Sequence, residues 1–137
     1  MPSPFFDFFQ AVDVALVAAG ALASVQYLRR SGRERFIHRQ RVLALKNALR
    51  EAGVPFRDGD SHIIPVMIGD AVLCKKVSDT LLQKQGFYVQ PINYPTVPRG
   101  TERLRVTVTP QHSEANIQEL AHALGMLVGV KKTMAAA

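Results

Sequence analysis

The segment from Glu102 to Thr109 alternates between apolar and polar side chains, and this pattern constrains the fold more than any other feature of the chain. Its apolar face carries Leu104, Val106 and Val108, and its polar face carries Arg103, Arg105 and Thr107. Successive side chains of a β-strand point to opposite faces, so a period of two predicts a strand with one buried face. Other elements must cover that face.

The rest of the chain predicts mostly helices that can supply this cover. The predicted elements are helix 11–29, helix 33–52, strand His62–Ile68, helix Asp70 to about Gln85, strand Phe87–Ile92, and a last helix capped by Ser113. Apolar stripes at helical spacing mark the buried faces. The stripes are Val42, Leu45, Leu49 and Ala52; Val72, Leu73, Val77, Thr80, Leu81 and Leu82; and Ile117, Leu120, Leu124 and Leu127. The expected class is α+β, with two helices followed by β-α-β-β-α.

Composition limits the function classes. With 137 residues, 47% of them hydrophobic, the chain predicts one compact domain. Its one cysteine, Cys74, excludes an internal disulfide and is interpreted as a small buried hydrophobe. Eight of the 17 basic residues fall between Arg29 and Arg50, which suits either a polyanion or a solvated helix face. Because Phe36 is the only aromatic residue there, we favour the solvated face and expect no nucleic-acid partner.

The run from Ala11 to Val25 is nearly all apolar and is followed by Arg29 and Arg30, as in a short membrane anchor. Asp13 would cost about 2.5–3.5 kcal/mol at the centre of a bilayer. The run is also rich in alanine, which contributes little to insertion. We therefore favour a helix that packs on protein, and a membrane contact of residues 5–30 is the alternative.

Metal and nucleophile motifs are not evident in the sequence. The four histidines are scattered as His38, His62, His112 and His122, without the i, i+3 or i+4 spacing of a helical metal site. No nucleophile elbow and no glycine-rich phosphate loop is found. We predict no metal site and no catalytic residue from these patterns.

The segment Gln90–Arg105 carries the candidate binding residues. Pro95 and Pro98 stiffen the loop around Thr96, which reduces the entropy lost when a ligand binds. Thr96 is expected to offer a hydroxyl and a backbone amide. Arg105, on the polar face of the strand, can offer a planar fork to a carboxylate. The alternative for Arg105 is a salt bridge to Glu102 or Glu114.

This segment, together with Ser61–Val66 and Gly69–Lys75, resembles the C-terminal part of the 5-aminolevulinate synthases. These are pyridoxal-phosphate-dependent α-oxoamine synthases of fold type I, and the likeness runs from about Val17 to Val128. It implies the C-terminal small domain of such a transferase, preceded by connecting helices. The expected division is 1–16 divergent, 17–55 connecting helices, 56–130 small domain and 131–137 tail.

The resemblance also implies an activity. The family is an acyltransferase that makes 5-aminolevulinate, CoA and carbon dioxide from glycine and succinyl-CoA, the first step of tetrapyrrole and heme biosynthesis. It implies a homodimer. The N-terminus is apolar and carries Asp7 and Asp13, unlike a mitochondrial transit peptide, so we expect a bacterial cytoplasm. It gives Arg105 the glycine carboxylate and Thr96 the succinyl end of the acyl-CoA, and it places the cofactor lysine upstream of the matched region. None of the six lysines stands in the family's lysine motif, so we expect no bound pyridoxal phosphate and no activity from this chain alone.

One departure from the family pattern lies near the N-terminus. Residues 10–15 stand where the family has a threonine-containing stretch that reaches the cofactor phosphate of the neighbouring subunit. The chain is therefore interpreted as a gene fragment or as part of a split gene. The alternatives are an interaction module that pairs with full-length synthase, or a weakly membrane-anchored basic protein.

Overall fold

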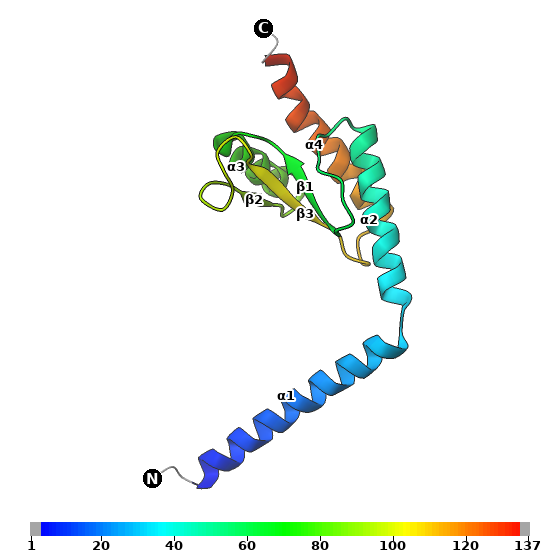
Figure 1. Ribbon diagram of the computed structural model, residues 1–137, viewed down its shortest axis with the longest axis vertical. Helices are drawn as coiled ribbons and strands as arrows, with labels where there is room; N and C mark the ends of the chain where they lie inside the picture. Colours follow the sequence, from blue (N-terminus) through cyan, green and yellow to red (C-terminus); the bar gives the residue numbers. More distant parts are fainter. Residues whose placement is uncertain (1–3, 135–137) are drawn as a thin grey trace. The chain divides into compact units, whose positions relative to one another are not determined.

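The structure, a computed structural model, describes the backbone of residues 4–134 and the side chains of residues 12–129. Its elements are α1 (Pro4–Arg30), α2 (Arg33–Glu51), β1 (Ile63–Met67), α3 (Ala71–Thr80), a π-helical turn η1 (Leu81–Gln85), β2 (Gln90–Ile92), β3 (Arg103–Thr107) and α4 (Glu114–Met134) (Figure 1). The predicted α+β order of two helices followed by β-α-β-β-α is confirmed. Two compact units divide the chain, unit 1 (Met1–Phe36) and unit 2 (Ile37–Ala137).

Unit 1 holds α1 and the first turn of α2. Glu34 connects them, because its carboxylate accepts hydrogen bonds from the Tyr27 hydroxyl at 2.6 Å and the Ser31 hydroxyl at 2.7 Å. The described chain has one helix, Val12–Arg30, that is long and apolar enough to cross a membrane. Core helices of soluble proteins share this length and apolarity, so the expectation that the helix packs on protein stays a prediction.

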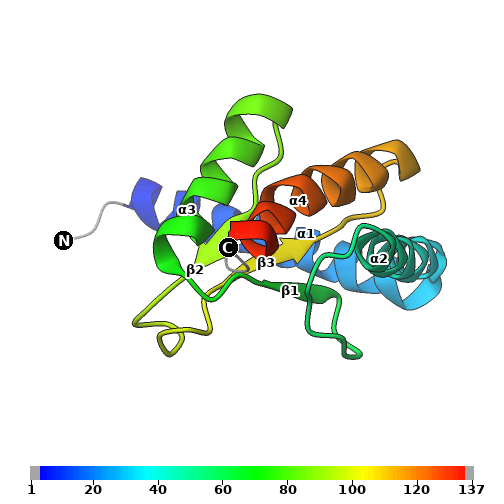
Figure 2. The same cartoon turned by 90° about the horizontal axis from the view of Figure 1, so that it is seen from above.

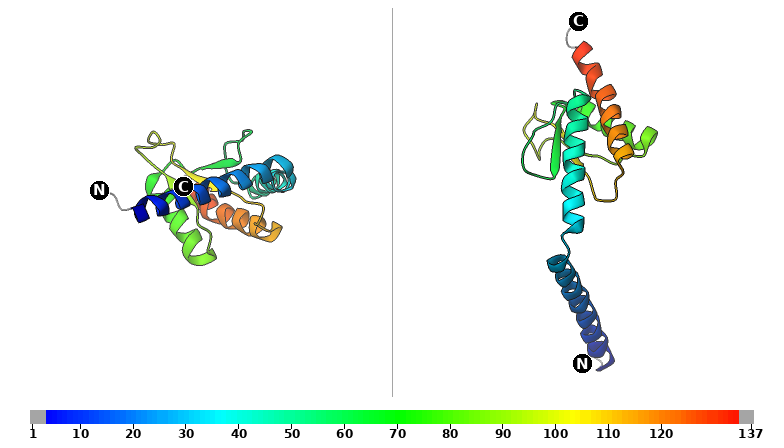
Figure 3. Two further views of the ribbon diagram at one scale, coloured as in Figure 1. Left: turned by 90° about the horizontal axis from the view of Figure 1, so that it is seen from below. Right: turned by 90° about the vertical axis from the view of Figure 1, so that its right-hand side faces the viewer.

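Unit 2 is built on a three-stranded antiparallel sheet in the order β1-β3-β2. The alternating strand is its centre, with Pro65 of β1 and Gln90 of β2 on either side of Arg105. Helices α3 and α4 lie on one face of the sheet (Figures 2 and 3). The other face carries the polar side chains of β3.

The prolines of the two outer strands lie at positions where the sheet needs no N–H group from them. The carbonyl of Pro65 accepts from Arg57 N at 2.9 Å, so the polar groups of Pro65 face away from β3. Hydrogen-bonded and non-hydrogen-bonded pairs alternate in an antiparallel ladder. Pro65 therefore lies in a non-hydrogen-bonded pair with Arg105, and Arg105 directs its own backbone groups to Gln90. By the same alternation Pro91, opposite Leu104, needs no N–H either.

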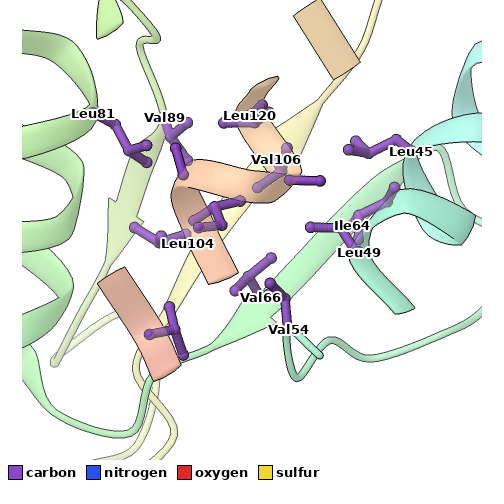
Figure 4. Packing of buried hydrophobic residues seen from close by; sticks show 14 of the residues in the cluster. Leu45, Leu49, Val54, Ile64, Val66, Leu81, Val89, Leu104, Val106 and Leu120 are labelled. Atoms are coloured by element: carbon purple, nitrogen blue, oxygen red, sulfur yellow. The ribbon is translucent and has the colours of Figure 1, made fainter. Parts of the chain in front are cut away.

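The core lies between the sheet and the helices. Ile64, Val66, Leu104 and Val106 are at most 2% exposed and pack against leucines of α2 and α4 (Figure 4). The predicted stripes of α2 and α4 are confirmed. The stripe of α3 is wrong in part, because Val72 is 79% exposed and Leu82 is 48% exposed. The buried face of α3 carries Cys74, Val77 and Ser78 and continues into Leu81 of η1, at i, i+3, i+4 and i+7.

Caps fix the ends of the helices beside the sheet. The Asp70 carboxylate accepts from Leu73 N at 2.7 Å and caps α3 where the helix was predicted to begin. The Ser113 hydroxyl accepts from Asn116 N at 3.1 Å, so the predicted cap of the last helix is confirmed. Gly86 ends η1 in the left-handed conformation, with a φ of 73°. Strand β2 is shorter than the predicted Phe87–Ile92, because residues 87–89 do not pair with β3.

Candidate substrate-carboxylate site

The open face of the sheet presents a guanidinium group at its centre. Arg105 is exposed on β3, and its neighbours across the ladder are Pro65 and Gln90. Arg103 stands two residues away on the same face and is half-buried. Its Nε donates to the carbonyl of Thr101 at 2.9 Å. None of the residues paired with Arg103 or Arg105 on the neighbouring strands is acidic. This face of the sheet is therefore positively charged.

Arg105 makes no ion pair and no side-chain hydrogen bond with any residue that the structure describes. The alternative of a salt bridge to Glu102 or Glu114 is therefore wrong. Glu102 is 4% exposed and points to the opposite face of the strand, where its Oε2 accepts from Gly100 N at 2.8 Å. A guanidinium with all its donors unused can bind a carboxylate in a bidentate manner.

The loop of Thr96 is held by its own hydrogen bonds. The carbonyl of Asn93 accepts from Thr96 N at 3.0 Å and from Val97 N at 3.4 Å. The Tyr94–Pro95 peptide bond is cis. The Arg99 guanidinium lies 4.8 Å above the Tyr94 ring. The Thr96 amide is thus occupied, and the expectation that it is free for a ligand is wrong.

The Thr96 hydroxyl remains available. The side chain is exposed, and the structure records no hydrogen bond from it to a described residue. The loop leaves the sheet at the pair Ile92 and Arg103. Arg105 lies two residues further along β3, about 7 Å from the base of the loop at the usual rise of a strand. The loop that carries Thr96 therefore begins close to Arg105 along the sheet.

No described lysine suits covalent attachment of pyridoxal phosphate, which needs a neutral amine in a desolvated pocket. Lys46 pairs with Asp58 at 2.9 Å, and its ammonium holds the pKa of the Asp58 carboxyl below the usual value. Lys75 is exposed and pairs with Asp79 at 2.7 Å. Lys76 and Lys84 lie on exposed helical surface. Among the described residues, no lysine therefore fits the covalent attachment of the cofactor.

Other reactive groups lie apart from this site. His38 and His62 bring their ring centroids to 5.4 Å, which the sequence could not show because 24 residues separate them. The described residues contain no group of three or more metal-ligating side chains. Burial raises the pKa of the Cys74 thiol, as suits a small hydrophobe. A cavity of about 210 Å³ lies between residues 86–89, the end of β3 and α4, and neither Thr96 nor Arg105 lines it.

Comparison with known proteins shows the family of the chain. The family model "Aminotransferase class I and II" matches residues 6–124, most of the chain. The chain belongs to this family. It is 54% identical over 122 residues to the 5-aminolevulinate synthase of Rhizobium meliloti, and 45% identical over 124 residues to that of Rickettsia prowazekii. These matches cover 89% and 90% of the chain, and the predicted resemblance to 5-aminolevulinate synthases is confirmed.

Solved structures give the same fold. A serine palmitoyltransferase from S. paucimobilis with bound PLP and myriocin superposes with a TM-score of 0.69 at 27% identity, over 79% of this chain and 28% of the other. The Sphingomonas wittichii serine palmitoyltransferase gives a TM-score of 0.71 at 22% identity, over 81% of this chain and 28% of the other. The fold of part of a fold-type I enzyme is confirmed. The chain spans about 30% of the length of the curated bacterial relatives it matches.

Proposed function

We propose that this chain is the substrate-carboxylate-binding part of a 5-aminolevulinate synthase, which joins glycine to succinyl-CoA and releases CoA and carbon dioxide. The observation that carries the proposal is the exposed, unpartnered guanidinium of Arg105 at the centre of the open sheet face. Arg105 binds the glycine carboxylate through two parallel hydrogen bonds. The Thr96 hydroxyl donates to the terminal carboxylate of the succinyl group.

The rest of the synthase supplies what this chain lacks. We place the pyridoxal-phosphate site in the part of the relatives that the chain does not match, since no described lysine fits it. Residues 17–55 act as connecting helices and residues 56–130 as the small domain. The whole enzyme works as a homodimer in the bacterial cytoplasm. The chain alone forms no 5-aminolevulinate.

The proposal is tested in a chimera in which the full chain replaces the matched segment of the Rhizobium meliloti synthase. The 54% identity over that segment supports compatible packing. We expect the chimera to make 5-aminolevulinate from glycine and succinyl-CoA, and the separate chain with added pyridoxal phosphate to make none. In the chimera, Arg105→Ala should raise KM for glycine by about 10- to 100-fold, as for loss of a hydrogen bond to a charged group.

Two results would contradict the proposal. A chimera that folds but has no activity would contradict the proposed synthase function and favour the alternative of an interaction module. An Arg105→Ala chimera with unchanged KM for glycine would remove the assigned role of Arg105. The matched control is Arg99→Ala. Arg99 is also an exposed arginine, but its guanidinium lies over the Tyr94 ring and has no assigned role in binding glycine.

A further inference from the structure

Gln90 is the polar side chain that lies directly across the sheet from Arg105. The two residues are ladder partners, and the alternation described above makes theirs a hydrogen-bonded pair. Their Cα atoms are then about 5.5 Å apart, and both side chains stand on the open face. The partner of Arg105 on the other strand is Pro65, which has no side-chain hydrogen-bonding group. Across the ladder, only Gln90 can therefore extend the polar site of Arg105.

The Gln90 amide is held in one orientation. The Tyr88 hydroxyl donates to Gln90 Oε1 at 2.6 Å. Tyr88 precedes Gln90 by two residues, so its side chain approaches from the same side of the chain. With the oxygen occupied, Nε2 offers two N–H groups, and the structure records no acceptor for them among the described residues. An oriented amide donor thus stands beside an unpartnered guanidinium.

This pair of groups suits one carboxylate. An ionised carboxylate has about four acceptor positions, and the fork of an arginine uses two of them. An amide N–H can take a third without adding charge, so it does not repel the guanidinium as another cation would. We propose that Gln90, oriented by Tyr88, is a second binding residue of the Arg105 site and donates Nε2–H to the same carboxylate. This inference rests on the proposed function, in which that carboxylate belongs to glycine.

Kinetics of the chimera give the first test. Gln90→Leu keeps the approximate size of the side chain and removes the donor. We expect KM for glycine to rise about 10-fold, with KM for succinyl-CoA and kcat within about twofold, because a hydrogen bond to a charged group is lost. Tyr88→Phe should raise KM for glycine by about threefold, since the amide stays but is no longer oriented. The matched control is Gln118→Leu, on the exposed surface of α4.

Glutamate at position 90 gives a second, sharper contrast. Gln90→Glu places a carboxylate opposite Arg105, and this group should occupy the guanidinium and exclude the substrate. We expect KM for glycine to rise more in Gln90→Glu than in Gln90→Leu. An unchanged KM for glycine in Gln90→Leu would overturn the proposal. So would an equal rise of both KM values, which indicates a general disturbance of the fold.

A binding measurement on the full chain separates this inference from the proposed function. Acetate is added to the isotope-labelled chain, and the NMR signals of the Arg105 Nε–H and the Gln90 amide are followed. Both signals should shift along one saturation curve, and the Gln90 response should vanish in Arg105→Ala. If the chimera is inactive but both signals still shift together, the proposed function fails and the shared carboxylate site stands. If acetate shifts Arg105 and leaves Gln90 unmoved, the inference fails.

Discussion

Gly125 of α4 lies against Ala52, the residue after the end of α2, and alanine at position 125 should destabilise unit 2. A Cβ at this position would lie 3.0 Å from Ala52 O and 3.3 Å from Ala52 Cβ. Ala52 cannot shift freely, because its N donates to Ala48 O at 2.9 Å and Val54 N donates to Leu49 O at 2.9 Å. The added methyl group therefore meets backbone that is held in place.

Two opposing effects set the magnitude. Alanine in a helix interior is more stable than glycine by about 0.5–1 kcal/mol. Overpacking against fixed atoms costs about 1–3 kcal/mol. We expect Gly125→Ala to lower the free energy of unfolding by about 1 kcal/mol. Gly129→Ala, in the same helix with open space around it, should raise it by up to about 1 kcal/mol.

Urea unfolding of the two variants measures this difference. Cys74 is the only cysteine and is fully buried, so the rate at which it reacts with a thiol reagent reports the opening of unit 2. Both variants carry the same substitution, and their free energies of unfolding should differ by about 2 kcal/mol. Equal stability, or a Gly125→Ala protein more stable than Gly129→Ala, would refute the close approach of α4 to Ala52.

Three further expectations follow from particular contacts. Asp70→Ala removes the cap of α3 and should cost about 1 kcal/mol in urea unfolding, whereas Asp60→Ala, at an exposed position, should cost little. Hydrogen bonds from Tyr27 and then Ser31 lower the pKa of Glu34 from 4.5 to about 2, so these contacts favour folding above about pH 4.5 and are lost as the pH falls towards 2. An NMR titration should give that midpoint, and Tyr27→Phe should raise it; a midpoint near 4.5 in the unaltered chain would contradict the contact. The Cys74 thiol should not react in the folded chain at pH 7, and rapid labelling without denaturant would show that it is not buried.

Local patterns predicted the elements well where one face of an element is buried. The period of two identified β3, and the spacing of Leu45 with Leu49 identified the buried side of α2. The pattern failed at Val72, because apolar residues occur on more than one side of α3 and hydrophobicity alone cannot choose between the sides. The π-helical turn at 81–85 was not predicted, since nothing in its composition distinguishes it from an α-helix.

The candidate site was predicted in part. Arg105 and the loop of Thr96 stood out as a fork on a polar strand face and a hydroxyl between prolines. That the Thr96 amide is occupied depends on the turn formed by Asn93, which the sequence does not specify. The neighbourhood of Gln90 and Arg105 depends on the register between β2 and β3. A register joins residues far apart in the chain, so it is visible only once the strands are paired.

The two prolines of the outer strands also disfavour pairings in which a strand is shifted out of register. If either outer strand slipped along β3 by one residue, its proline would move to a position where the ladder requires an N–H, and a hydrogen bond would be lost. The same slip would turn that strand's core side chains to the open face. Misaligned sheets are therefore penalised twice, once by each effect. Pro65 and Pro91 thus select, among competing pairings, the alignment that holds Arg105 between Pro65 and Gln90.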